Sequence, residues 1–243
     1  MSRTSHTSND YQYIADLQLF GIDILFNDLN NYQNLIESFL QKERENLEEE
    51  FSSTDLELES KKAGENHREY YNHLIDSYSE RHHDIAGLFP HHFRSFFITQ
   101  TMSVIEAELK KLCNYYGSRS KQKFKVDDMK GSSDLEKCKF YITHISGVKF
   151  RDFQNEWDFI LNCKLLRNKI VHEEAKVKRE NKELWKFINN HPSLTHDENV
   201  AEGDSVSFTI EDNALAKDLL KHGKEFLLKL VEKLKEEISA QAQ

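Results

Sequence analysis

The sequence predicts an all-α protein, an up-and-down helical bundle with an N-terminal helical extension. Three observations lead to this expectation. The 243 residues include only 8 glycines and 2 prolines, too few for the corners of a protein made of many strands. Charged residues make up 31% of the chain, which is typical of long helices with solvated faces. Apolar residues also recur at intervals of three and four along most of the chain.

Hydrophobic periodicity places the helices along the chain. They are expected at about residues 11–50, 66–85, 90–117, 133–145, 150–175, 181–189 and 212–238. Pro90 suits the first turn of a helix, where its missing N–H is not needed, and the helix before it is expected to end near Gly87. Residues 206–210 alternate apolar and polar side chains, so we expect at most one short β segment, near 205–210.

Pro90 is also the best candidate for a boundary in the chain. It separates residues 1–88, an N-terminal helical extension, from residues 89–243, a helical domain. Residues 1–40 carry an apolar stripe with few basic residues, which we expect either to dimerise or to cover the core. In the last helix, the following residues are expected to form bundle core, with a dimer seam as the alternative: Phe226, Leu227, Leu230, Val231 and Leu234.

The start of the chain carries no recognisable targeting or membrane signal. The first ten residues are polar, and the apolar stretch at 17–26 is short and interrupted by Asp23. The three cysteines form no Cys-x-x-Cys pair, so neither a disulfide framework nor a zinc site is expected. The histidine pairs at 82–83 and 91–92 point to different helix faces and are interpreted as surface residues. We therefore expect a cytoplasmic protein with no cofactor, no metal and no membrane contact.

The net charge of −9 argues at first against a nucleic-acid partner. The charge is unevenly distributed, however, because residues 1–100 carry a net −10 whereas residues 119–182 carry +6. Salt limits the reach of distant charges to about 10 Å, so a basic segment of an acidic protein can still attract RNA. The basic block begins with the loop at 119–125 and includes the helix predicted at 150–175.

On one side of the helix predicted at 150–175, the residues change from apolar to polar near the C-terminal end. At about 100° per residue, Trp157 lies on the same side as Arg167, Asn168 and His172, so polar residues continue an apolar stripe. Polar groups that face a core are costly to bury unless they are paired, solvated in a cleft or used at an interface. The pattern therefore predicts a functional site, and a buried structural hydrogen-bond network at the helix end is the alternative.

The separation of Arg and His is by itself a weak signal. Arg68 and His73 have the same separation, and we interpret them as surface residues. The pair at Arg167 and His172 differs in context, because a polar residue follows the arginine, an apolar pair precedes the histidine and the helix is apolar on two sides.

The segment Leu165-Leu-Arg-Asn-Lys-Ile-Val-His172 resembles the motif of the HEPN (higher eukaryotes and prokaryotes nucleotide-binding) superfamily. Ribonucleases of this superfamily carry Arg-x4–6-His, commonly with Asn, Asp or His after the arginine. The helix that opens at Phe89-Pro-His-His-Phe-Arg-Ser95 and continues through Ser103-Val-Ile-Glu-Ala-Glu-Leu-Lys-Lys-Leu112 is also similar. The resemblance covers roughly residues 89–243, implies a HEPN-like helical bundle there, and does not explain residues 1–88.

By this resemblance the chain is a metal-independent endoribonuclease of a toxin–antitoxin, abortive-infection or other antiviral defence system. The resemblance implies a homodimer in which two protomers join their motifs into one RNA cleft, and an antitoxin or defence-system protein as a further partner. The implied products are a 2′,3′-cyclic phosphate and a 5′-hydroxyl.

The resemblance also implies a catalytic role for three residues. His172 would handle the proton of the RNA 2′-hydroxyl or of the leaving oxygen, because histidine side chains titrate near neutral pH. Arg167 would hold the scissile phosphate, and Asn168 would orient His172 or bind the phosphate. Glu106 or Glu108, on the preceding long helix, is a candidate support for the arginine or the histidine.

The basic segment supplies the predicted RNA-binding residues. Lys164 and Lys169 lie on the helix of the motif, and Lys121 and Lys123 lie in the basic loop. Glu174 stands where related toxins often have a tyrosine that can be modified, so that mode of control is not expected. The alternative function is a catalytically silent HEPN-like bundle that binds RNA or a protein through the same cleft.

Overall fold

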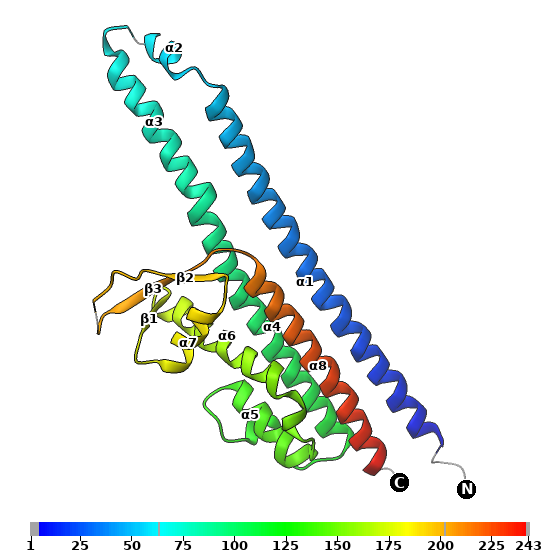
Figure 1. The fold of residues 1–243 in the computed structure, drawn as a ribbon. Helices are drawn as coiled ribbons and strands as arrows, with labels where there is room; N and C mark the ends of the chain where they lie inside the picture. The colour runs from blue at the N-terminus through cyan, green and yellow to red at the C-terminus, as the bar shows by residue number, and fades with distance from the viewer. Residues whose placement is uncertain (1–4, 63, 202, 242–243) are drawn as a thin grey trace.

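The computed structural model describes residues 5–62, 64–201 and 203–241, and it shows a mostly helical protein. Residues 1–4 of the predicted extension lie outside the described residues. Three long helices lie side by side (Figure 1): α1 (Ser5–Ser53), α4 (Phe89–Arg119) and α8 (Ala214–Gln241). Helix α6 (Gln154–His172) packs against α4 and α8 on the side away from α1. The expectation of an all-α protein is therefore confirmed in its coarse form.

Shorter helices connect or flank these four: α2 (Leu56–Lys61), α3 (His67–His83), α5 (Asp134–Tyr141) and α7 (Lys182–Asn190). Side-chain caps begin three of them. Asp55 accepts a hydrogen bond from the backbone N–H of Leu58, Ser133 accepts one from Glu136, and Asn181 accepts one from Leu184. Helix α5 runs into a π-turn and stops at Gly147, whose φ of +80° favours glycine.

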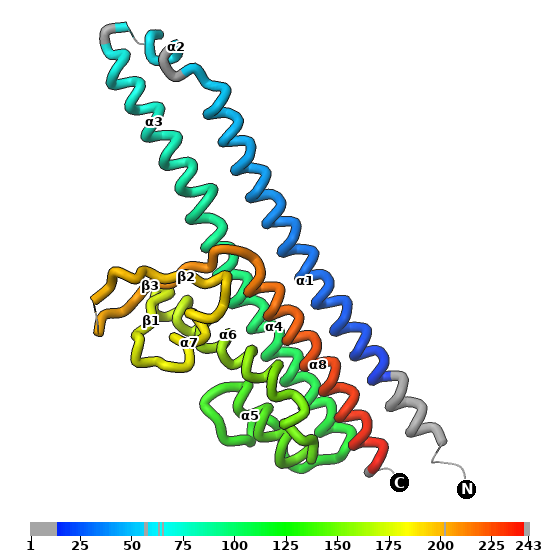
Figure 2. The backbone as a smooth tube through the Cα atoms, in the orientation of Figure 1, coloured from blue at the N-terminus to red at the C-terminus, as the bar shows by residue number. Residues whose placement is uncertain are grey.

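The helix predicted to end near Gly87 does not end there. Helix α3 passes through a π-turn at Asp84–Leu88 directly into α4, and the tube in Figure 2 continues without a break. The backbone N–H of Phe89 donates to the carbonyl of Asp84, five residues back. A π-turn is wider than an α-turn, so it gives room to the ring of Pro90, which would otherwise crowd the carbonyl four residues earlier. Residues 67–119 therefore follow one continuous helical path, and Pro90 lies within it.

The second half of α1 and α3 form a two-helix arm that projects beyond the bundle, with α2 near its tip (Figure 2). None of the residues of α3, all of which the structure describes, is buried. The contacts within the arm are half-buried or exposed. Phe51 stacks on Tyr78 with ring centroids 3.7 Å apart, and Arg81 donates to both carboxylate oxygens of Glu50 at 3.0 and 2.9 Å. Leu47 of α1 is buried, so the arm has a narrow seam with little core of its own.

A small antiparallel sheet lies beside the end of α6. Its strands are β1 (Lys176–Lys178), β2 (Leu194–His196) and β3 (Ser205–Ile210), in the spatial order β1-β3-β2. The strand expected near 205–210 is confirmed, but the expectation of at most one β segment is wrong. Strands β1 and β2 have three residues each, too few to show a period of two, and they form because β3 supplies their hydrogen-bond partners.

The core lies where α4, α6 and α8 meet. Trp157 of α6, Phe226 of α8 and Phe150 before α6 form an aromatic cluster with ring centroids 4.8–6.2 Å apart. The residues of α8 that were expected to form bundle core are buried, which confirms that expectation over a dimer seam: Phe226, Leu227, Leu230, Val231 and Leu234. The apolar stripe of residues 1–40 is divided, because Ala15, Ile22 and Phe26 are buried whereas other members are exposed.

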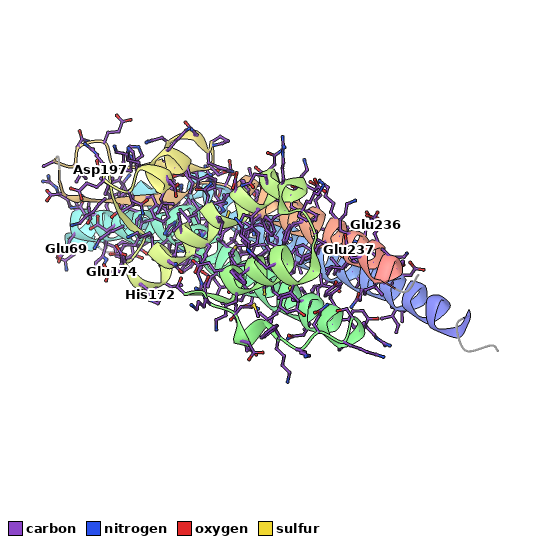
Figure 3. All side chains as sticks on the ribbon, turned by 90° about the horizontal axis from the view of Figure 1, so that it is seen from below. Glu69, His172, Glu174, Asp197, Glu236 and Glu237 are labelled. Atoms are coloured by element: carbon purple, nitrogen blue, oxygen red, sulfur yellow. The ribbon has the colours of Figure 1, made fainter. Side chains whose placement is uncertain are left out.

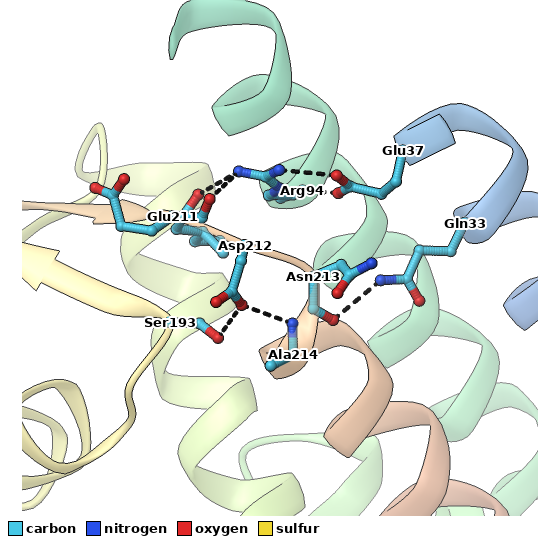
Figure 4. A network of polar contacts seen from close by, with 9 residues as sticks. Gln33, Glu37, Arg94, Ser193, Glu211, Asp212, Asn213 and Ala214 are labelled. Carbon is cyan, nitrogen blue, oxygen red and sulfur yellow. Dashed lines mark hydrogen bonds and ion pairs between the residues drawn. The ribbon is translucent and has the colours of Figure 1, made fainter. Parts of the chain in front are cut away.

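A polar network ties α1, α4 and the start of α8 together (Figure 4). Arg94 donates to both carboxylate oxygens of Glu37 at 2.8 Å each, and also to the backbone carbonyls of Ile210 and Glu211. Gln33 donates to the carbonyl of Asn213 at 3.1 Å. These bonds fix the end of β3 against the two long helices and so orient the sheet relative to the bundle.

Two further expectations concern the state of the three cysteines and the presence of a membrane-spanning helix. Cys113, Cys138 and Cys163 are free and buried, as the sequence predicted. Burial raises the pKa of the Cys163 thiol far above its usual range, so the neutral thiol is the stable form there. No described helix combines the length and the apolar character that crossing a bilayer requires.

Candidate active site at the end of helix α6

The last two turns of α6 carry the residues that the sequence singled out. Trp157, Ile160 and Leu166 are buried against the bundle, which fixes the orientation of the helix. Beyond Leu166 the packing becomes looser: Ile170 is half-buried against the core, Val171 is 49% exposed and His172 is exposed. The apolar stripe read from the sequence is therefore core at its start and surface at its end.

Arg167 is half-buried, and its guanidinium is only partly satisfied. Its Nη1 donates to Asn168 Oδ1 at 3.2 Å, whereas its Nε is buried without a hydrogen-bond partner among the described residues. A buried donor left unpaired costs about 1–3 kcal/mol, so each such group in a native structure calls for a reason. A guanidinium held in place with spare donors is suited to bind an anion such as a phosphate.

Glu106 of α4 is the acidic neighbour of this arginine. Burial raises the pKa of its carboxyl above the usual range, and the nearby charges of Arg167 and Lys164 only partly oppose that effect. Glu106 therefore lies within electrostatic reach of the motif, although it forms no ion pair with either cation among those the structure describes. Of the two glutamates considered from the sequence, Glu108 instead pairs with Lys111 at 2.5 Å.

His172 stands in the final turn of α6, and the backbone after it is strained. Glu174 and Ala175 have φ of 52° and 57°, a left-handed conformation that is uncommon outside glycine. The N–H of Ala175 returns to the carbonyl of Lys169 at 3.0 Å, which closes the helix end and directs the chain into β1. Figure 3 shows His172 and Glu174 together at the surface, at the end of the molecule opposite Glu236 and Glu237.

The imidazole of His172 has no hydrogen bond or ion pair with any residue that the structure describes. Both ring nitrogens of His172 are therefore available to a ligand. The three predicted catalytic residues thus lie on two successive turns of one helix, with the arginine and asparagine half-buried and the histidine exposed.

The predicted RNA-binding lysines fall into two groups. Lys164 is engaged by α5, because its Nζ donates to Ser133 Oγ at 2.6 Å, and Lys169 pairs with Glu173 at 2.6 Å. Lys121 and Lys123 are exposed in the loop after α4. Helix α4 continues for about 20 Å beyond Glu106 before that loop begins, at 1.5 Å per residue. After this loop the chain returns to α4, because Asp127 pairs with Lys110 at 2.7 Å.

The second Arg-x4-His pair differs from the first in its surroundings. Arg68 and His73 are both exposed on α3, where no residue is buried. No buried unpaired donor and no acidic neighbour from another helix accompanies them among the described residues. Their interpretation as surface residues is confirmed.

In the described part of the chain, no three His, Cys, Asp or Glu side chains gather in a way that would hold a metal ion. No family model, curated protein or solved structure matches this chain.

Sequence reasoning did not anticipate how the helix end is built. It extended α6 to about residue 175, whereas the helix ends at His172 and the strained turn follows. The available sequence signal was an apolar residue, Val177, between two lysines, which is the alternation of a short strand. In the structure Val177 is buried and both lysines are exposed. The lysine contacts with α5 had a signal too, because Ser133 and Glu136 have the spacing of a helix N-terminus.

Proposed function

We propose that the chain is a metal-independent endoribonuclease of the HEPN type, with Arg167, Asn168 and His172 as its catalytic residues. One observation carries the proposal. At the end of α6, the half-buried guanidinium of Arg167 has an unpaired Nε and lies within two helical turns of the exposed imidazole of His172. A phosphodiester uses both groups, since the guanidinium binds a non-bridging oxygen while the imidazole reaches a proton at the neighbouring oxygen.

The proposed reaction is an internal transesterification of RNA. The 2′-oxygen attacks the adjacent phosphorus, and the bond from phosphorus to the 5′-oxygen breaks. One proton leaves the 2′-hydroxyl and one is taken up by the 5′-oxygen, so the products are a 2′,3′-cyclic phosphate and a 5′-hydroxyl. Arg167 stabilises the negative charge that grows on the phosphate in the transition state, and Asn168 orients the guanidinium through its 3.2 Å hydrogen bond.

The reaction moves two protons, whereas one copy of the motif offers one imidazole. We therefore place the active cleft between two copies, in which one His172 acts as base and the other as acid. The exposed end of α6 suits such a contact, because the half-exposed Val171 adjoins His172 there. In this proposal an antitoxin or defence-system protein acts in the cytoplasm by covering the same surface.

The test is an RNA cleavage assay on the purified chain in the presence of EDTA. Cleavage is expected to persist with the chelator and to fall by at least about a hundredfold in Arg167→Ala and in His172→Ala. The products are expected to carry a cyclic phosphate, which acid treatment followed by mass spectrometry identifies. The matched controls are Arg68→Ala and His73→Ala, the exposed pair with the same spacing, which should leave the rate unchanged.

Cleavage that survives both motif substitutions, or that requires a divalent metal, contradicts the proposal. No described residue forms a hydrogen bond that would orient the His172 imidazole, and this favours a second candidate, a silent HEPN-like bundle that binds RNA or a protein partner. That candidate predicts RNA retention without cleavage, with Arg167→Ala weakening the retention and His172→Ala leaving it almost unchanged.

A further inference from the structure

The outward face of α1 carries an unusual amount of exposed apolar surface. Six large side chains on it are between 42% and 67% exposed: Leu17, Phe20, Ile24, Tyr32, Leu35 and Phe39. The opposite face of the same helix packs on the bundle, through Ala15, Ile22 and Phe26. We call the six exposed residues the outer stripe.

The six residues of the outer stripe share one face of the helix, with Asp28 between Ile24 and Tyr32. At 100° per residue its six members fall within an arc of about 120°, which is the width of one helix face. Tyr32 is held in place from behind, because its ring packs against Phe93 and Phe97 with centroids 6.2 and 6.4 Å away. The stripe is therefore presented on a rigid surface.

The area of the stripe matches a protein interface. Taking about 200 Å² for a fully exposed large apolar side chain, the six residues expose on the order of 700 Å². A stable interface buries about 800 Å² per partner, whereas the largest apolar patch on a typical monomer is about 300–600 Å². The stripe is large enough to form the centre of a stable interface.

We propose that a second copy of this chain covers the outer stripe, with the two α1 helices antiparallel and a two-fold axis near Asp28. The pattern is nearly symmetric about that residue. An antiparallel copy brings together Leu17 with Phe39 and Ile24 with Tyr32, and it places Phe20 one residue away from exact register with Leu35. Each pair matches one aromatic with one aliphatic side chain. Layers of equal volume keep two helices at a constant separation.

A parallel arrangement of the same two helices fits less well. It would place Phe20, Tyr32 and Phe39 each against its own copy and would leave thin layers at the aliphatic positions. Alternating wide and narrow layers leave gaps, and gaps lose dispersion contacts. The sizes of the side chains therefore select the antiparallel pairing.

Asp28 lies in the same arc as the stripe and would meet its own copy at the axis. Two carboxylates in a partly desolvated seam repel each other, which weakens the association. The interface is therefore reversible, and its strength depends on the charge at this one position.

This interface is separate from the proposed active cleft. Helix α1 lies on the side of α4 and α8 away from α6, so a copy docked on α1 leaves the end of α6 uncovered (Figure 1). The two proposals can therefore fail independently, because substitutions in the outer stripe leave Arg167 and His172 in place.

The first experiment compares the molar mass of the wild-type chain with that of Phe20→Asp/Leu35→Asp by sedimentation velocity. Both residues are more than 60% exposed, so the fold is expected to persist, which circular dichroism checks. The double variant is expected to halve the mass of the assembly and to raise its dissociation constant at least about a hundredfold. The control Leu58→Asp, at a residue 57% exposed near the tip of the arm, should leave the mass unchanged.

Two further variants test the register. Asp28→Asn is expected to lower the dissociation constant by about tenfold, because it removes the repulsion at the axis. Ile24→Cys mixed with Tyr32→Cys should form a disulfide between chains more readily than either variant alone, and the native cysteines are buried and will not compete. A wild-type mass unchanged by Phe20→Asp/Leu35→Asp overturns the interface, and preferential pairing of Ile24→Cys with itself overturns the antiparallel arrangement.

Discussion

The contribution of a single side chain to the stability of this protein depends on its burial, as two arginines illustrate. Arg94 and Arg81 each donate to both oxygens of one glutamate on α1, at 2.8–3.0 Å. The Arg94 pair is 14% exposed on both sides, whereas the Arg81 pair is more than half exposed. Water screens the second pair but not the first, so the same geometry gives different energies.

We predict that Arg94→Ala lowers the free energy of unfolding by about 2–4 kcal/mol, because it leaves the Glu37 carboxylate buried and two backbone carbonyls unpaired. Urea denaturation followed by circular dichroism measures the change. Arg81→Ala is the matched control and should change it by less than about 1 kcal/mol. Equal losses in the two variants would show that burial does not decide the difference.

Glu106 provides a prediction about pH. Burial raises the pKa of its carboxyl in the folded state, so folding favours the protonated form. The sign follows from linkage: stability from this group is present below the unfolded pKa and is lost as pH rises through the folded pKa. Glu106→Gln should therefore gain stability relative to the wild type between about pH 4 and pH 8, measured by thermal unfolding at both values. A difference that does not change with pH would contradict this assignment.

At the scale of elements, helices α1, α4 and α6 all pack against α8. Gly223 marks the closest approach, since a methyl group there would lie 2.5 Å from Ile105 Cδ1 on α4 and 3.2 Å from Phe26 Cε1 on α1. Glycine lowers helix propensity, so its presence in the middle of α8 has a packing reason. The three helices meet at this one residue.

We predict that Gly223→Ala destabilises the protein by about 1–3 kcal/mol, because the overlap with Ile105 exceeds what helix propensity returns. Gly21→Ala on α1 is the matched control, since nothing lies within 4 Å of a methyl group there and propensity alone should add about 1 kcal/mol. The opposite signs are checked by chemical denaturation of both variants. A stabilised Gly223→Ala would mean that the three helices separate easily.

Short elements explain where expectation from the sequence failed. Apolar spacing located the long helices because a helix of many turns repeats its pattern several times. Strands β1 and β2 repeat nothing in three residues, and they exist because β3 pairs with both. The π-turn at Asp84–Leu88 was predicted to be a helix end because it contains Gly87 and Pro90 follows it. Packing of α1 against this turn instead supports a continuous helix.

At the scale of the whole molecule, the charge distribution and the geometry give a prediction for RNA binding. Lys121 and Lys123 are exposed in the loop that follows α4, a helix that ends about 20 Å beyond Glu106, on a chain whose net charge is −9. In the proposed function they contact RNA beyond the scissile phosphate. Such contacts strengthen binding and its salt dependence without touching the chemistry.

We predict that Lys121→Ala/Lys123→Ala weakens binding of long RNA and lowers the slope of log K against log salt by about 1.4, at about 0.7 per phosphate contact on a single strand. Cleavage of an oligonucleotide too short to reach the loop should be unchanged. Filter binding at several salt concentrations and single-turnover kinetics measure the two effects. A lower rate on the short substrate would place these lysines in the active cleft instead.

The sequence by itself determined the helical class, the positions of the long helices, the buried face of α8 and the Arg167–His172 spacing, because each depends on side-chain order along one helix. Only the tertiary structure decided which polar groups are left without partners. The burial of Arg167 Nε, the proximity of Glu106 and the exposure of the outer stripe depend on how separate helices pack. Residues far apart in the chain set these properties, and local periodicity carries no information about such neighbours.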